Sequence, residues 1–286
     1  MQREKLVLSD GRNLEFLRNG IKSDAAIILH AGTTQDITGW KIWLDAFADK
    51  GVMGIAIGRS GYVGSTAKPG RITIDIARDV SELADSLDLR RMVNVGLSGG
   101  GQHAIATGLD RRSVGVVTIG SLAPFEEMGE DFYSGMQQAD LDEYADALRD
   151  INDLVKRFQG WLEKDVGTQF TQKEVSANDK RAQDSPSWKI IFDSCDLTMR
   201  AGWDWVADDY SSYLKPWGFD PRDVKVPVII WQGGLDKNVP PQHGKWLAQN
   251  IPHSTLKLIE DESHIGLYIN YENQAMQDAI ELLNID

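Results

Sequence analysis

Short apolar runs alternate with segments of helical periodicity over the first 120 residues of the chain. Four runs predict strands, at residues 25–30, 52–57, 91–97 and 114–119. Helices are expected between and after them, at residues 40–50, 73–89 and 99–108. Strands and helices that alternate in this way are typical of a mostly parallel sheet with helices on both faces.

The two ends of the chain complete the predicted sheet. Residues 5–9 and 13–17 flank the turn dipeptide Asp10-Gly11, so they predict an antiparallel hairpin at the sheet edge. Near the other end the alternation resumes with strands at 226–231 and 255–259 and helices at 240–250 and about 275–283. The sequence therefore predicts an α/β fold with eight strands.

The segment from residue 123 to residue 220 interrupts this alternation. It consists of helical patterns and holds five of the nine tryptophans. Its charge also differs, because residues 124–220 carry 21 acidic and ten basic side chains, a net −11 of the chain's −13. We expect a helical insertion after the sixth strand of a single α/β domain.

Composition excludes several classes of protein. With 286 residues and 42% hydrophobic residues, the chain can bury a full core. Its net charge of −13, without a long basic cluster, argues against nucleic-acid binding, and no apolar run is long enough to span a membrane. The only cysteine, Cys195, allows no internal disulfide, and the first ten residues do not resemble a signal peptide. A cytoplasmic location is expected.

Ser98 is the candidate nucleophile. It lies in Gly96-Leu97-Ser98-Gly99-Gly100, a G-x-S-x-G pattern between a predicted strand and a predicted helix. Flanking glycines permit a sharp turn that exposes the serine hydroxyl and leaves the next N–H, that of Gly99, free to bind an oxyanion. Ser60 also follows a strand, but the residues after it cannot begin a helix at once, so we expect a loop residue there.

A serine nucleophile needs a base and an orienting acid. His264 lies in the loop after the last predicted strand, and Asp236 lies in a tight turn after the preceding one. We expect these two residues to complete the triad at the carboxyl edge of the sheet. A helix cap or turn former is the alternative for Asp236.

The other four histidines are expected to have no catalytic role. His103 is five residues past Ser98 on the same helix, so a packing or hydrogen-bonding role is expected. His30 ends a strand beside the expected oxyanion loop and is expected either to be structural or to support the site, while His243 and His253 are expected at the surface.

A second oxyanion donor is expected in the loop after the third strand. Gly32 permits an unusual backbone conformation there, and the N–H of Thr33 can face Ser98. The N–H of Gly32 itself is the alternative donor, and a plain turn is the alternative for the whole loop.

These motifs resemble those of the α/β-hydrolase fold family along nearly the whole chain, in particular a group of bacterial serine hydrolases that is similar to proline iminopeptidases. Residues 30–34 are similar to that group's H-H-G-T-P loop, residues 59–66 to D-R-P-G-Y-G-G-S-T, and residues 96–103 to G-W-S-G-G-G-P-H. Residues 216–220 and 232–236 match the segments before and at the acid, and Ser263-His264 matches the base.

The resemblance implies a triad of Ser98, Asp236 and His264, with Thr33 and Gly99 as oxyanion donors. It also implies a core of residues 1–122 and 221–286 and a helical lid over residues 123–220. The chain departs from the group's pattern at Ala31, Thr34 and Gly58, and the first two changes alter the oxyanion loop.

Together the residues and the resemblance predict a serine hydrolase that cleaves a small ester, lactone or amide through an acyl-enzyme. C–C hydrolysis, perhydrolysis and peptidase activity use the same triad, and a receptor-like relative with slow turnover is a further alternative. No metal or organic cofactor is expected, because the triad and the backbone donors supply the nucleophile, the base and the charge stabilisation. The absence of H-x-H or H-E-x-x-H spacing also argues against metal-dependent hydrolysis. The acidic charge of the insertion favours a neutral or cationic substrate, and its five tryptophans favour a partly apolar one. The sequence does not indicate an oligomeric state.

Overall fold

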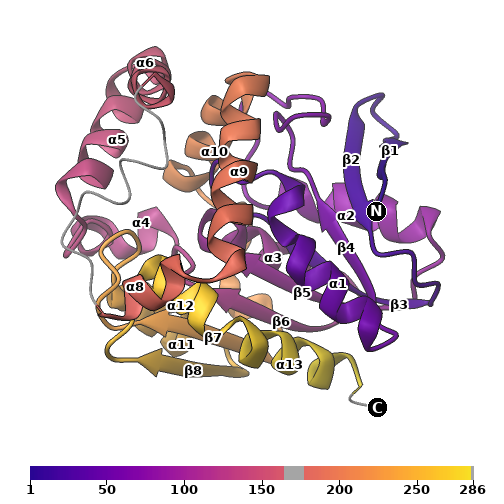
Figure 1. Ribbon diagram of the computed structural model, residues 1–286. Coiled ribbons are helices and arrows are strands. Elements are labelled where there is room, and N and C mark those ends of the chain that lie inside the picture. The colour runs from indigo at the N-terminus through magenta and orange to yellow at the C-terminus, as the bar shows by residue number, and fades with distance from the viewer. Residues whose placement is uncertain (164–176, 285–286) are drawn as a thin grey trace.

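A computed structural model describes residues 1–163 and 177–284 of the chain, and within them eight strands form one sheet (Figure 1). The strand order is β1-β2-β4-β3-β5-β6-β7-β8. All pairs from β4 to β8 are parallel, and β2 is antiparallel to both of its neighbours. The strands are β1 (Arg3–Val7), β2 (Asn13–Arg18), β3 (Ala25–His30), β4 (Met53–Ile57), β5 (Arg91–Leu97), β6 (Ser113–Ile119), β7 (Val228–Gly233) and β8 (Ser254–Ile259).

Helices cover both faces of the sheet. Successive residues of β3 point to opposite faces, so Ile27 and Leu29 pack with one set of helices and Ala26 and Ile28 with another. The first face carries α1 (Lys41–Asp49) and α13 (Glu272–Leu283), and the second carries α2 (Asp75–Ser86), α3 (Gly101–Thr107) and α11 (Pro241–Asn250). The predicted α/β fold with eight strands is confirmed.

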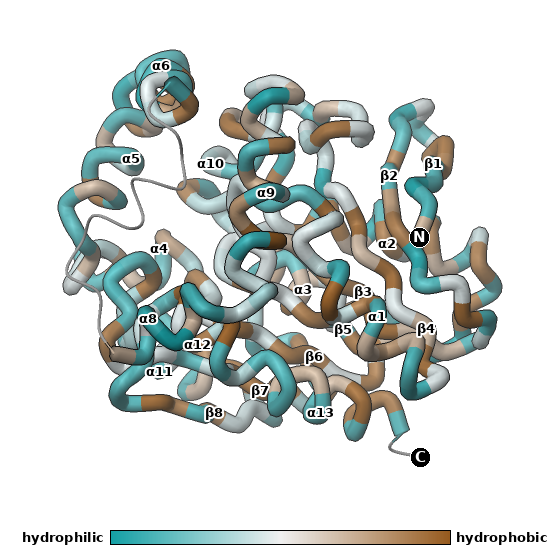
Figure 2. The backbone as a smooth tube through the Cα atoms, in the orientation of Figure 1, coloured by the Kyte–Doolittle hydropathy of each residue, from teal (hydrophilic) through white to brown (hydrophobic). Residues whose placement is uncertain are grey.

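A run of helices lies between β6 and β7, and we call residues 123–220 the helical insertion. In Figure 1 its longer helices stand together beyond one end of the sheet, and Figure 2 shows mostly hydrophilic residues along α5. Its helices are α4 (Phe125–Met128), the 3-10 helix η3 (Gly129–Phe132), α5 (Gln138–Arg149), α6 (Ile151–Leu162), α8 (Ala177–Gln183), α9 (Pro186–Ala201) and α10 (Asp204–Leu214). Three further short helices are η1 (Ile37–Trp40), η4 (Pro221–Asp223) and α12 (His264–Asn270).

The tryptophans of the helical insertion have two different environments. Trp205 and Trp217 are almost fully buried among other apolar side chains, whereas Trp161 and Trp188 line a cavity. None of the helices in the described residues has the length and apolar character needed to cross a bilayer.

Candidate active site

Ser98 lies at a sharp turn between β5 and α3. The turn is the 3-10 helix η2 (Ser98–Gly100), and Ser98 has φ +52°, a left-handed conformation that costs a non-glycine residue roughly 1–3 kcal/mol. The glycines around Ser98 leave no room for a side chain. A Cβ on Gly96 would overlap the backbone at Gly100, and a Cβ on Gly100 would overlap the His30 carbonyl. The strained turn predicted from the sequence is therefore present.

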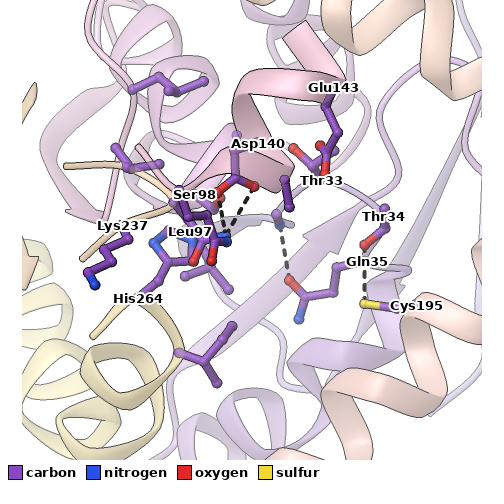
Figure 3. A pocket seen from close by; sticks show the side chains of 18 of the residues that line it. Thr33, Thr34, Gln35, Leu97, Ser98, Asp140, Glu143, Cys195, Lys237 and His264 are labelled. Atoms are coloured by element: carbon purple, nitrogen blue, oxygen red, sulfur yellow. Dashed lines mark hydrogen bonds between the residues drawn. The ribbon is translucent and has the colours of Figure 1, made fainter. Parts of the chain in front are cut away.

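His264 and Asp236 meet beyond the ends of β7 and β8. The Asp236 Oδ2 lies 2.6 Å from His264 Nδ1. The other carboxylate oxygen of Asp236 accepts the N–H groups of Asn238 and Val239, at 2.9 and 2.8 Å. These bonds fix the carboxylate, and Nδ1–H of the imidazole donates to it, so Nε2 is left as the proton acceptor. Figure 3 shows Ser98 and His264 directed into one cavity, whose lining includes both.

The pKa of His264 is raised above its usual value. Burial of the ring opposes its positive charge, but the carboxylate of Asp236 favours that charge and outweighs burial, with a smaller contribution from Asp140 on α5. A base with a raised pKa takes a proton from serine more readily, and it is inactivated by protonation at a correspondingly higher pH.

Gly120 makes room for the His264–Asp236 pair, a role that sequence reasoning missed. It follows β6 directly and has φ +58°. A Cβ at Gly120 would lie 2.9 Å from the His264 ring and 3.3 Å from Asp236 Oδ2. The position of a glycine at the end of a core strand is the signal that could have identified it.

The loop after β3 brings Gly32 and Thr33 against Ser98. The N–H of Gly32 donates to Gln35 Oε1 at 3.0 Å, so this amide is already engaged. Among the described residues, the N–H of Thr33 has no hydrogen-bond acceptor. Of the two candidate donors, the geometry thus favours Thr33 over Gly32. Thr34 follows with φ +67°, which shows how sharply this loop turns.

The cavity above Ser98 has a volume of about 850 Å³ and is walled largely by the helical insertion. Aromatic side chains from α6, α9 and α10 form much of this wall, among them Phe158, Trp161, Trp188, Phe192, Tyr210 and Tyr213. Asp140 and Glu143 also line it from α5, and the side chain of Asn238 donates to Asp140 at 3.2 Å (Figure 3). Sequence reasoning did not identify these acids, because no local motif contains them.

Two histidines expected at the surface differ in their environment. His253 is exposed, as predicted, but the prediction for His243 was wrong, because its side chain is fully buried. Its Nδ1 accepts the N–H of Ala123 at 3.1 Å, so Nε2 carries the proton and donates to the Phe132 carbonyl at 2.9 Å. The ring is covered where the helical insertion packs on α11, and burial lowers its pKa to about 4.

Three other residues lie as the sequence predicted or close to it. His103 is buried and its Nδ1 lies 2.8 Å from the Gly99 carbonyl, a hydrogen-bonding role. His30 is buried at the end of β3 beside Asn94. Ser60 lies in the loop after β4 and does not line the cavity.

Cys195 lies closer to the candidate active site than the sequence indicated. It lines the cavity, and its thiol accepts the Thr34 hydroxyl at 3.3 Å. Burial raises the pKa of the thiol to about 11, so it remains protonated near neutral pH. In the part of the chain that the structure describes, no group of three His, Cys, Asp or Glu side chains is arranged to hold a metal ion.

Comparison with known proteins gives matches over nearly the whole chain. The family model described as "alpha/beta hydrolase fold" matches residues 25–271. A hydrolase from Pseudomonas aeruginosa PA01 is 19% identical, with a TM-score of 0.71 and 99% of each chain covered. The enol-lactonase from Burkholderia xenovorans LB400 is 18% identical, with a TM-score of 0.68, over 99% of this chain and 100% of that one. A bromoperoxidase from Bacillus anthracis is 21% identical, with a TM-score of 0.72 and both chains fully covered.

Proposed function

The chain belongs to the alpha/beta hydrolase fold family, and from this premise we propose that it is a serine hydrolase that cleaves a small ester, lactone or amide. One observation carries the proposal: His264, joined to Asp236 at 2.6 Å, lines the same cavity as a serine held in a left-handed turn. Nucleophile, base and orienting acid are the three parts that acyl transfer needs.

In the proposed reaction, Ser98 Oγ attacks the substrate carbonyl while His264 Nε2 takes the hydroxyl proton. Asp236 stabilises the imidazolium that forms, and the N–H groups of Thr33 and Gly99 stabilise the developing oxyanion. The imidazolium then protonates the leaving group, which gives an acyl-enzyme on Ser98. Water, activated by His264, hydrolyses that ester and restores the free serine.

We further propose that residues 1–122 and 221–286 act as a catalytic core and that the helical insertion, residues 123–220, acts as its lid. The aromatic wall that the helical insertion contributes to the cavity supports this division and favours a partly apolar substrate. Asp140 and Glu143 in the same wall support a neutral or cationic substrate rather than an anionic one. The single buried thiol supports the proposed cytoplasmic location.

The test is steady-state turnover of the purified protein on a panel of neutral esters, lactones and aminoacyl amides, with Ser98→Ala as the matched variant. We expect many turnovers per enzyme molecule on at least one of these classes and a loss of several orders of magnitude in the variant. Turnover that stops at one acyl-enzyme equivalent would instead favour a receptor-like role. Equal activity of the variant would contradict the proposed nucleophile.

A further inference from the structure

A single carboxylate in the helical insertion collects an unusual number of donors. Asp209 on α10 is fully buried and accepts Arg59 at 2.6 Å, Arg71, and the hydroxyls of Tyr62 and Tyr213, the last at 2.8 Å. Two buried guanidinium groups around one buried carboxylate keep it ionised, so it acts only as an acceptor. None of these residues belongs to the proposed triad.

Two partners of Asp209 hold the backbone of the oxyanion loop, residues 31–34. The Arg59 guanidinium donates to the Ala31 carbonyl as well as to Asp209. The Tyr62 hydroxyl accepts the N–H of Thr34 at 3.2 Å while it donates to Asp209. The residues on both sides of the Gly32–Thr33 turn are therefore tied to the same carboxylate.

A third partner holds Thr33 itself. The Tyr213 hydroxyl lies 2.6 Å from Thr33 Oγ1 and 2.8 Å from Asp209 Oδ2. Because an ionised carboxylate cannot donate, the Tyr213 hydrogen points to Asp209, and the Thr33 hydroxyl must donate to Tyr213. A Cβ on Gly99 would overlap the hydroxyl oxygens of both Tyr213 and Thr33, so both hydroxyls lie directly against Gly99.

A chain of hydrogen bonds also connects Gly99 to the Asp209 carboxylate. Arg71 NH1 lies 2.9 Å from His103 Nε2, and a guanidinium can only donate, so Nε2 accepts and Nδ1 carries the hydrogen. That Nδ1–H donates to the Gly99 carbonyl at 2.8 Å. Arg71 also donates to Asp209, which closes the connection.

We propose that Tyr213 and Asp209 are positioning residues for the oxyanion hole, because their hydrogen bonds lead to both residues whose N–H groups would bind the oxyanion. The inference rests on the proposed function and extends it. The helical insertion, besides walling the cavity, would set the geometry of the catalytic loop beneath it. Loosening this arrangement should weaken transition-state stabilisation more than substrate binding, since the oxyanion exists only after attack.

The test compares Tyr213→Phe, Thr33→Val and Thr33→Ser in the full chain, assayed with a neutral p-nitrophenyl ester. Tyr213→Phe and Thr33→Val each remove one hydroxyl from the Thr33–Tyr213 bond, and we expect kcat to fall roughly tenfold to a hundredfold, somewhat less than the loss of a whole oxyanion donor. KM should change less than about threefold, and the acid limb of the pH profile should stay in place. Thr33→Ser keeps the hydroxyl and should restore most of kcat.

The matched control is Ser212→Ala, on the same helix. The buried Ser212 hydroxyl donates to the backbone carbonyl of Asp209 and not to its carboxylate. Its kcat should stay near that of the wild type. The double variant Tyr213→Phe/Thr33→Val should be no slower than the slower single variant, because both changes break one bond. A wild-type kcat in Tyr213→Phe, or Thr33→Ser as slow as Thr33→Val, would overturn the inference. A wild-type protein that turns over none of the esters, lactones and amides and does not react with a fluorophosphonate would contradict the proposed function and this inference with it.

Discussion

The proton on His264 Nδ1 is held by the Asp236 carboxylate, 2.6 Å away, and this one bond decides which ring nitrogen can serve as a base. The two backbone N–H groups on the other Asp236 oxygen keep the carboxylate from turning. The proposed chemistry at the residue scale therefore depends on orientation as much as on charge.

Replacement of Asp236 by Asn should leave the fold intact and lower kcat by about 10⁴-fold, because an amide can hold the wrong imidazole tautomer. The measurement is kcat on the best ester of the panel, with circular dichroism to verify folding. Asp223→Asn, at an exposed residue that does not line the cavity, is the control and should be fully active. Near-full activity of the Asp236 variant would show that another carboxylate is the partner of His264.

The raised pKa of His264 predicts the acid limb of the pH profile. The base works when neutral, so kcat/KM should fall as the pH drops through an apparent pKa higher than that of an ordinary histidine. Asp140→Asn removes a carboxylate that favours the charged ring and should shift this limb to lower pH, whereas Asp142→Asn on the same helix should shift it less. An unmoved limb in Asp140→Asn would mean that Asp140 does not act on the base.

At the scale of elements, the sequence predicted the sheet and its helices because the core strands are short apolar runs, buried on both faces, and the helices between them repeat apolar residues at helical spacing. The first strand lies two residues earlier than expected, at Arg3–Val7, since Leu8 turns inward and is buried. His243 could not be predicted in the same way. Its burial depends on contact with the helical insertion 120 residues away in sequence, and no local pattern encodes that contact.

The candidate site was predictable in part because the positions of the strands were predictable. Ser98, Asp236 and His264 each follow a strand, and strand ends can be read from periodicity. The Asp209 cluster was missed because its partners are distant in sequence: Arg59 and Asp209 are 150 residues apart. Complementary buried charges on two separate elements leave no periodic signal in either one.

α10 carries a second buried carboxylate, that of Asp208, which makes the stability of the protein depend on pH. Asp208 accepts the N–H of Lys68 at 2.9 Å, and burial raises its pKa to about 6. A raised pKa means that the folded state binds the proton more tightly than the unfolded state. Ionisation of Asp208 therefore destabilises the folded state, and the free energy of unfolding falls as the pH rises from about 4 through 6.

Asp208→Asn keeps an acceptor for Lys68 without a charge. We expect it to raise the free energy of unfolding at pH 7.5 on the order of 1–2 kcal/mol, and to give little gain at pH 4. Urea denaturation at both pH values measures the difference. Asp204→Asn, an exposed acid on the same helix, should show no comparable gain. A gain of equal size at both pH values would show that ionisation is not the cause.

For the whole molecule, the acidic charge is concentrated in one segment. The helical insertion carries most of the net charge of −13, and part of it is compensated locally by ion pairs such as Arg157–Asp146 and Arg149–Asp153. Asp140, Asp142 and Glu143 line the cavity, which also has Arg157 and Lys237 in its wall. The field at the cavity should disfavour anions, and salt should screen it over a Debye length of about 8–10 Å.

This field can be tested with a matched pair of esters, one neutral and one bearing a carboxylate, at low and high ionic strength. At low salt kcat/KM should be higher for the neutral ester, and the anionic ester should gain relative to it as salt rises. An anionic ester that is the better substrate at low salt, or that gains nothing, would show that the charge of the helical insertion does not govern selection.

Peptide mapping after labelling with a fluorophosphonate tests whether Ser98 is the nucleophile. We expect a single adduct on the peptide that contains Ser98, formed faster than hydrolysis of the reagent in buffer and absent in Ser98→Ala. An adduct on Ser60, or one that persists in the Ser98→Ala variant, would contradict it.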